Sequence, residues 1–239
     1  MQKITTIGAF CILMLFTINA LAQKTISSNE IIEKARRGEP ITYDNVIIEG
    51  TVDFTFYFEK KNEEEFSRKR SKWNDSNNSI EEMISSEIVF VDCIFKDGVI
   101  AYYHDDYTEF TFTASFSKVV VFKNCKFEEE SAFKYSDFRE KTDFSGSSFD
   151  EEALFKYAKF YDYADFHQAA FDDDANFKYA KFKNGLDFSN ASFDKDLNLK
   201  YAKIDGDFKS DNMDIRDDLD VKYTEINGES FSKYLLKSR

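Results

Sequence analysis

The chain contains few of the residues on which most active sites depend. Its 239 residues include two histidines, His104 and His167, three cysteines, eight glycines, one proline and one tryptophan. No glycine-rich phosphate loop is visible, and no nucleophile is spaced with a base and an orienting residue as covalent catalysis requires. We therefore expect a protein that is not an enzyme, with no catalytic residues, no metal site and no cofactor.

Phenylalanine is the residue that the chain has in excess, with 27 copies. From Phe122 to Ile204 a large apolar residue recurs after alternating steps of five and six residues. The positions are 122, 127, 133, 138, 144, 149, 155, 160, 166, 171, 177, 182, 188, 193, 199 and 204, and fourteen of the sixteen are Phe. This spacing fits neither the period of a helix nor that of a strand, so it indicates an internal repeat.

The repeat has an identity period of 22 residues. Blocks that read large-Lys-Tyr begin at Phe133, Phe155, Phe177, Leu199 and Val221. Each period contains four steps, which predicts a coil with four sides and one large inward residue on each side. Coils stacked in parallel at about 4.8 Å would bury these residues, and no coil can do so alone.

Most units place a small residue two positions before the large one, as in 158–162 (AKFYD) and 191–195 (ASFDK). This pattern is similar to that of the pentapeptide-repeat family, whose units centre on Leu or Phe with Ala two residues earlier. The resemblance is specific over 114–204. It implies an all-β solenoid, a right-handed quadrilateral parallel β-helix, and no catalytic residues. A sixth residue in alternate units makes this chain an 11-residue 5+6 variant and predicts bulged corners on two of the four sides.

The first 22 residues resemble a secretory signal. Lys3 precedes a mostly apolar run over 7–16, which is too short to span a bilayer comfortably, and small residues flank Leu21. Cleavage near Ala22 would leave an exported chain, periplasmic or secreted, that begins at Gln23. An uncleaved anchor is the alternative.

The remaining sequence predicts a repeat array with a cap at each end. Residues 23–40 form the N-terminal capping segment, with a capping box before a helix over about 28–37. Residues 41–226 form the β-helix, irregular over 41–115 and regular over 116–226. Residues 227–239 form a C-terminal helical cap, for which the alternative is a homodimer contact.

An insertion over 59–87 interrupts the repeat pattern. Two interpretations are open for it. It is either a recognition arm that Trp73 anchors, or a solvated excursion whose aromatic residues lie against the wall of the coil.

Cys93 and Cys125 each precede a ladder Phe by two positions. They are 32 residues apart, so they share a side only if the irregular region 98–110 adds about ten residues to the period. Their Cα atoms would then lie near 5 Å apart, within disulfide range. The pair is therefore a candidate disulfide, and two free buried thiols are the alternative.

The 22-residue period also stacks outward residues into columns. One column is Lys134, Lys156, Lys178, Lys200 and Lys222; the next is Tyr135, Tyr157, Tyr179, Tyr201 and Tyr223; a third is Lys159, Lys181 and Lys203. They predict a basic, aromatic binding face on a chain whose net charge is −13. The alternative is that the columns have no function and arose because duplication of a repeat unit copied its lysine and tyrosine residues.

Acidic residues form columns as well, namely Asp143, Asp165 and Asp187, and Asp150, Asp172 and Asp194. His167 precedes three aspartates at 172–174, a grouping with the chemistry of a metal site. Outward positions are polar throughout the array, so a solvated turn explains this grouping better.

Two functions remain open from the sequence. The first is a non-enzymatic exported scaffold that presents the Lys and Tyr face to an anionic polymer, an envelope surface or a protein; acidic polysaccharide and lipid headgroups are the candidate partners. The second is a DNA mimic that inhibits a nucleic-acid enzyme through its acidic columns. The export signal and the lysine columns argue against the second, and the negative charge disfavours direct binding of nucleic acid.

Overall fold

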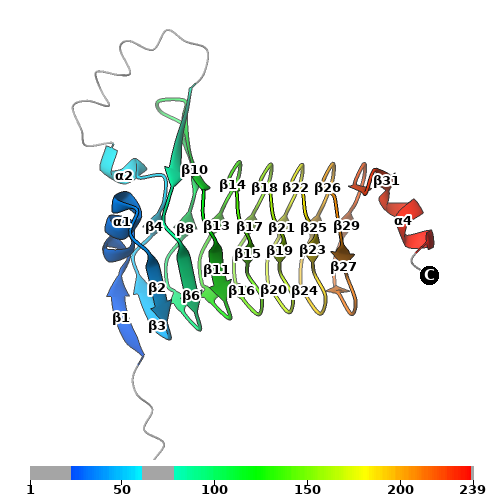
Figure 1. Ribbon diagram of the computed structural model, residues 1–239, viewed down its shortest axis with the longest axis horizontal. Helices are drawn as coiled ribbons and strands as arrows, with labels where there is room; N and C mark the ends of the chain where they lie inside the picture. The colour runs from blue at the N-terminus through cyan, green and yellow to red at the C-terminus, as the bar shows by residue number, and fades with distance from the viewer. Residues whose placement is uncertain (1–22, 61–77, 238–239) are drawn as a thin grey trace, which may run out of the picture.

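The computed structural model describes residues 23–60 and 78–237, which wind into an elongated four-sided β-helix (Figure 1). Helix α1 (Ser28–Arg37) lies at one end of the stack and helix α4 (Phe231–Lys237) at the other. The four sides are sheets of parallel strands, apart from two antiparallel pairs on face D, and are named here faces A, B, C and D. The chain passes through them in the repeating order B, A, C, D, so the corners are B/A, A/C, C/D and D/B.

Faces A and B contain the following strands. Face A consists of β1 (Lys24–Ser27), β3 (Val46–Glu49), β7 (Ile94–Phe95), β12 (Lys126–Phe127), β16 (Ser148–Phe149), β20 (Ala170–Phe171), β24 (Ser192–Phe193) and β28 (Asp214–Ile215). Face B consists of β2 (Ile41–Asp44), β6 (Ile88–Val91), β11 (Val120–Lys123), β15 (Thr142–Asp143), β19 (Ala164–Asp165), β23 (Leu186–Asp187) and β27 (Phe208–Lys209).

Faces C and D complete the coils. Face C consists of β4 (Val52–Asp53), β8 (Val99–Ile100), β13 (Ser131–Ala132), β17 (Ala153–Leu154), β21 (Ala175–Asn176), β25 (Leu197–Asn198) and β29 (Leu219–Asp220). Face D consists of β5 (Ser79–Ile84), β10 (Phe110–Phe116), β14 (Asp137–Phe138), β18 (Lys159–Phe160), β22 (Lys181–Phe182), β26 (Lys203–Ile204), β30 (Glu225–Ile226) and β31 (Glu229–Ser230), with β9 (Tyr102–Asp105) antiparallel to β10.

From Phe116 onward the register between coils is 22 residues, as the sequence predicts, while the coils before it pair at intervals of 32 and 47 residues. On face D, Phe116 pairs with Phe138, Phe138 with Phe160, and Phe160 with Phe182. Equivalent residues therefore lie directly above one another on each side. This confirms the quadrilateral β-helix and the family's fold.

Stacked phenylalanine rings fill the interior. Phe155 and Phe177, for example, have ring centroids 5.0 Å apart and planes that differ by 2°. Both rings are fully buried, as are the small inward residues Ala158 and Ala180. The small residues leave room for the rings of the neighbouring columns, so the interior is filled without a gap. This is why a small and a large residue recur two positions apart.

The 5+6 alternation comes from two kinds of corner. The five-residue steps cross corners B/A and C/D, where one residue in each turn has a positive φ. At C/D the Ala158 N–H donates to the Phe155 carbonyl and closes a tight turn through Tyr157. The six-residue steps cross corners A/C and D/B. The extra residue thus lies at two corners only, as predicted.

Both ends of the stack carry the predicted helices. Ser27 accepts a hydrogen bond from the Asn29 N–H at the start of α1, and Gly38 ends the helix with a φ of +66°. The apolar side of α1, including Ile31 and Ile32, is buried. The strand β1 was not predicted: it precedes the helix and adds one strand to face A through its pairing with β3.

The predicted insertion is shorter in the structure than 59–87. Helix α2 (Tyr57–Lys60) begins it, and β5 ends it by pairing with β10 from Ser79 onward. Ile84 is already an inward ladder residue, 1% exposed. The sequence of β5, SIEEMI, conceals this strand because two glutamates stand among its apolar residues. Residues 61–77, with Trp73, lie outside the described residues, as do 1–22.

A hairpin explains the irregular region near 98–110. At corner C/D, Phe116 follows Ile100 by 16 positions, whereas in the next coil Phe138 follows Ala132, the residue paired with Ile100, by six positions. The ten additional residues form most of β9 and the outer part of β10. Phe110 and Phe112 pack in a second apolar cluster with Tyr57, so they do not belong to the main ladder.

We expect Phe177→Ala to destabilise the protein by about 3–5 kcal/mol, because it leaves a cavity between two fully buried rings. Tyr179→Ala, two residues later on the outside of the same turn, should cost much less. Denaturant unfolding of both variants measures the difference. Equal losses would contradict the assignment of inward and outward positions.

Candidate functional site

The five tyrosines predicted to form a column stack along corner C/D. Consecutive ring centroids lie 5.0, 4.7, 4.7 and 4.8 Å apart from Tyr135 to Tyr223. The planes of the central rings Tyr157, Tyr179 and Tyr201 differ by 3° at most. Because each ring face covers the next, the column presents ring edges and hydroxyl groups to solvent. No hydrogen bond from these five hydroxyls to another described residue is present.

Each column tyrosine occupies the left-handed region of backbone space. Their φ values are +66° at Tyr135, +62° at Tyr157 and Tyr179, +61° at Tyr201 and +63° at Tyr223. A residue with a Cβ atom pays roughly 1–2 kcal/mol for this conformation, and Asn or Gly tolerates it best. The sequence did not predict this strain, since the period shows which residues stack but not their φ.

The lysine columns lie on either side of the tyrosine column. The first precedes it in the turn: the Nζ atoms of Lys134, Lys156, Lys178, Lys200 and Lys222 lie 5.1, 5.5, 5.5, 6.0 and 5.1 Å from the centroid of the following Tyr ring. The other follows it on face D, where Lys159 pairs with Lys181 and Lys181 with Lys203. All thirteen predicted residues are therefore brought together at one corner.

Three of the eight lysines in these columns have acidic partners. Lys159 Nζ lies 3.1 Å from Asp137, Lys203 Nζ 2.9 Å from Glu225, and Lys200 Nζ 3.8 Å from Asp220. Among the described residues, no carboxylate lies within ion-pair distance of the other five ammonium groups, which are those of Lys134, Lys156, Lys178, Lys181 and Lys222.

The stacking of like charges acts on the ammonium group of Lys156. Partial burial, together with repulsion from Lys134 and Lys178, lowers the pKa of its ammonium group. The charged form is therefore disfavoured in the folded chain, and an anion bound along the column would relieve this cost.

Comparison with known proteins identifies the family of residues 112–203. A family model for pentapeptide repeats matches residues 112–159 and 155–203. Residues 112–203 are pentapeptide repeats. Neither the curated proteins nor the solved structures contain a significant match to the chain. Pentapeptide repeat proteins are generally non-catalytic, so the family match directs attention to the surface of the array.

The pentapeptide repeats also carry a strongly acidic corner, A/C. The acidic side chains there are Glu128, Glu129, Glu130, Asp150, Glu151, Glu152, Asp172, Asp173, Asp174, Asp194, Asp196, Asp217 and Asp218. Four of these carboxylates pair with cations of the described chain: Glu128 with Lys96 at 2.7 Å, Asp150 with Lys126 at 2.9 Å, Asp173 with Lys195 at 3.4 Å and Asp194 with Arg216 at 2.8 Å. Asp150, Asp172 and Asp194 of the predicted columns belong to this corner.

The other predicted acidic column, on face B, has a structural role. Asp143, Asp165 and Asp187 each accept a hydrogen bond from the N–H two residues later, at 3.0, 3.0 and 2.9 Å. Burial, with repulsion from Asp143 and Asp187, raises the pKa of Asp165. These carboxylates shape corner B/A of the pentapeptide repeats. The N–H that Asp165 accepts is that of His167, which places His167 in a polar turn.

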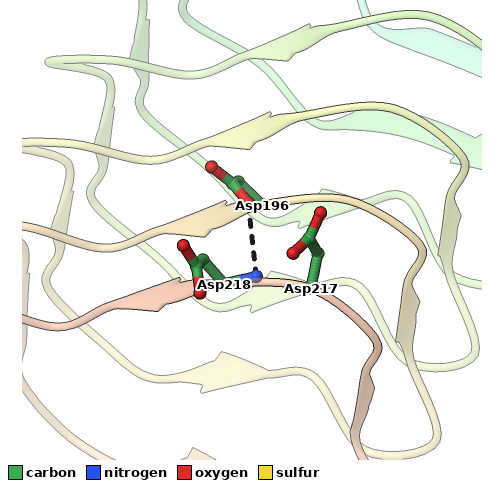
Figure 2. A group of neighbouring side chains, drawn as sticks. All are labelled: Asp196, Asp217 and Asp218. Carbon is green, nitrogen blue, oxygen red and sulfur yellow. Dashed lines mark hydrogen bonds between the residues drawn. The ribbon is translucent and has the colours of Figure 1, made fainter.

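Three carboxylates near the C-terminal end of the acidic corner gather closely. Asp196 belongs to one coil and Asp217 and Asp218 to the next, with oxygen atoms within 4.8 Å of one another (Figure 2). The Asp218 N–H donates to Asp196 at 3.2 Å. The sequence did not predict this cluster. Nearly every coil carries acidic residues at corner A/C, so nothing in the sequence distinguishes these three from the others. All three side chains are exposed, and we assign no metal to them.

Tyr102 joins the tyrosine column at its N-terminal end, although the sequence did not predict it. Its ring centroid lies 6.0 Å from that of Tyr135, and its hydroxyl accepts a hydrogen bond of 2.9 Å from Lys134. The interval to Tyr135 is 33 residues, because the β9–β10 hairpin intervenes. A search at period 22 therefore does not find it.

Cys93 and Cys125 occupy equivalent positions in adjacent coils. Their neighbours Ile94 and Lys126 are paired in register, and both cysteines are free and buried. The thiol of Cys93 donates to the Val91 carbonyl at 3.2 Å and that of Cys125 to the Phe90 carbonyl at 3.5 Å. The neighbouring thiol lowers the pKa of Cys93, while the neighbouring thiol and burial raise that of Cys125. The two cysteines therefore lie on the same side of the β-helix, which the sequence predicted only if the irregular region added ten residues. The disulfide itself stays a prediction.

We expect the pair to be oxidised in exported protein and reduced in protein made without residues 1–22 in a reducing cytosol. Thiol counting on the denatured, unreduced chain should then find no free thiol in the first sample and two in the second. Two free thiols in both samples would contradict the disulfide.

We expect Lys178→Ser to raise the pKa of Lys156 toward the ordinary lysine value, by removing one repelling neighbour. Lys181→Ser, in the other column, should leave that pKa unchanged. A side-chain NMR titration of Lys156 measures both. Because the folded-state pKa is lowered, the unfolded chain binds more protons as pH passes it, so wild-type stability should rise with pH toward the ordinary lysine pKa.

Proposed function

We propose that this protein is a non-enzymatic scaffold whose C/D corner binds a linear, acidic polysaccharide. The observation that carries the proposal is the column of five left-handed tyrosines. The opposite corner, B/A, makes the same tight turn with Asn124, Gly146, Gln168, Asn190 and Asn212. The fold therefore does not require tyrosine at this place.

The cost of this arrangement supports a role beyond folding. Each left-handed Tyr costs roughly 1–2 kcal/mol, and each stacked pair returns only about 0.5–1.5 kcal/mol. The two nearly cancel, so stacking leaves little net gain to explain five successive tyrosines. Backbone strain of this kind concentrates at functional sites, where surrounding structure holds it in place.

The corner offers hydrogen-bond donors over its whole length. Phenol hydroxyls and ammonium groups alternate across it, and ammonium groups accept no hydrogen bond. A matching ligand is anionic and rich in acceptor oxygens. The column of five rings extends about 19 Å in a straight row with a repeat near 4.8 Å, which suits a linear polymer. A corner is a ridge, so a flat membrane surface would contact less of it than a single chain does.

Export is part of the proposal. Residues 1–22 would direct the chain to the compartment where acidic polysaccharide occurs, and cleavage near Ala22 would release it there. Within residues 23–60 and 78–237, no helix has the length and apolar character needed to cross a bilayer.

One observation favours the alternative of a DNA mimic. Over three coils, corner A/C carries three carboxylates per coil, or one charge per about 1.6 Å, close to the roughly 1.7 Å of duplex DNA. The donor columns at the neighbouring corner C/D would be unexplained by that role, so we rank it second. Competition with duplex DNA for a DNA-binding enzyme tests it.

We expect the wild-type chain to bind acidic polysaccharide with strong dependence on salt. The probes are polygalacturonate, alginate, hyaluronate and heparin, with neutral dextran as the negative polymer. Lys156→Glu, Lys178→Glu and Lys200→Glu combined should abolish binding without unfolding, because the middle of the donor strip becomes acidic. Calorimetric titration measures binding and circular dichroism the fold.

Two further variants sharpen this test. A control with Lys118→Glu, Lys123→Glu and Lys195→Glu has the same net charge as the triple variant but keeps corner C/D, and should bind normally. Tyr157→Asn, Tyr179→Asn and Tyr201→Asn combined should weaken binding while the fold persists, since Asn190 makes the equivalent turn at B/A. If the lysine triple variant still binds the polymer, the C/D corner is a solvent-exposed surface that takes no part in binding.

A further inference from the structure

We propose that a pocket at the N-terminal end of the tyrosine column binds the terminal sugar unit, so that the polysaccharide is held by its end. This inference rests on the proposed function of the C/D corner and adds to it a direction and a specificity. Its evidence is separate: the position of the β9–β10 hairpin and the residues that surround the pocket.

The hairpin interrupts the ridge at the end of the column. It leaves corner C/D in the coil before Tyr135, between the registered residues Ile100 and Phe116. Only Phe116 of β10 pairs with β14, so the outer part of β10 extends past the coil, as Figure 1 shows. The strand β5 pairs with β10 along the other edge and widens this wall. A polymer lying along the tyrosines meets the wall beyond Tyr135.

A pocket of about 480 Å³ lies at the foot of this wall. It is lined in part by Thr111 and Thr113 of β10, Glu81 of β5, and Tyr135, Asp137 and Lys159 of the repeats. Tyr135 and Lys159 belong to the columns of the binding face as well. The pocket is therefore continuous with the donor strip, and its volume falls within the range that holds a small organic ligand.

The chemistry of the pocket differs from that of the strip. The charged groups of the strip are ammonium donors, whereas the pocket adds carboxylate acceptors. Asp137 accepts hydrogen bonds from Lys159 at 3.1 Å, and Glu81 accepts one of 2.6 Å from Ser115. With the hydroxyls of Thr111 and Thr113, these carboxylates match groups that both donate and accept hydrogen bonds, as sugar hydroxyls do.

The exposed ring of Tyr135 adds an apolar surface. It is 45% exposed and has only the tilted Tyr102 ring on its N-terminal side, where the inner members of the column have parallel neighbours. A terminal sugar can lie against it. An anionic terminus such as a phosphate would be repelled by Glu81 and Glu109, which line the pocket, whereas the third carboxylate, Asp137, is paired with Lys159 and Arg139. The ligand class is thus a polysaccharide with an uncharged, hydroxyl-rich end unit followed by acidic units.

The test compares intact and fragmented polymer at equal mass. The decisive probe is hyaluronate, because its repeat contains an uncharged amino sugar and hydrolysis that leaves this sugar terminal multiplies matching ends without changing composition. If ends are held, the protein bound per unit mass rises with the number of ends, above the salt-sensitive binding to the polymer interior. The same capacity for intact and fragmented polymer would overturn the inference.

A matched pair of variants locates the effect. Thr111→Trp fills the pocket from β10, where the wild-type side chain is half-buried, and should weaken binding of the fragments at least about tenfold. Binding to the interior of intact polymer through the lysines should remain salt-sensitive. Ser192→Trp, also half-buried on an outward position of face A, controls for an added indole and should have no effect.

The outcomes separate the two proposals. If Thr111→Trp is folded by circular dichroism and binds fragments as tightly as the wild type does, the pocket is not the site of the terminal sugar. The proposed function of the C/D corner is unaffected by that result. Loss of fold in that variant moves the decision to the capacity measurement, which uses wild-type protein alone. Failure of the wild type to bind any polymer of the panel overturns the proposed function, and this inference with it.

Discussion

The hydrogen bonds between successive coils are the constraint on which the rest of the structure depends. The Tyr157 N–H donates to the Lys178 carbonyl and the Tyr179 N–H to the Lys200 carbonyl, each at 2.9 Å, and similar bonds run along every side. They fix each residue directly over the one 22 positions earlier. A coil has no partner for its backbone until the next coil is present, so sides, rings and columns all form together or not at all.

This constraint acts differently inside and outside the stack. Inside, it places aromatic rings at a separation that suits parallel stacking, which is why phenylalanine can repeat almost without exception. Outside, the same spacing brings like charges together at Lys134, Lys156 and Lys178, where it is unfavourable. Aspartates on face B avoid much of this cost by accepting backbone N–H groups, whereas the middle lysines have no comparable partner in the described chain. Because the repulsion between these lysines is not offset within the described chain, an anionic ligand would stabilise corner C/D.

The sequence could predict the parts of the molecule that repeat and not the parts that occur once. The Phe ladder fixed the number of sides, the coil length and the membership of the lysine and tyrosine columns, since identical spacing leaves one way to stack them. The strand β5 escaped prediction because its glutamates lie where the sheet extends beyond the core. Tyr102 escaped because a hairpin shifts its spacing from Tyr135. The positive φ of the column tyrosines has no signature in periodicity, since Tyr is seldom selected for that conformation.

The hairpin at corner C/D has a consequence for how such a molecule can change. Ten residues are added between Ile100 and Phe116, yet Cys93 and Cys125 on the preceding side remain in register, and so does every pair after Phe116. The number of residues at a corner can therefore change without altering the length or the register of the strands on the sides. A foreign loop grafted in place of the hairpin tip would inherit a fixed base and a fixed orientation. The solenoid can therefore acquire new surface one corner at a time, without any compensating change in its interior.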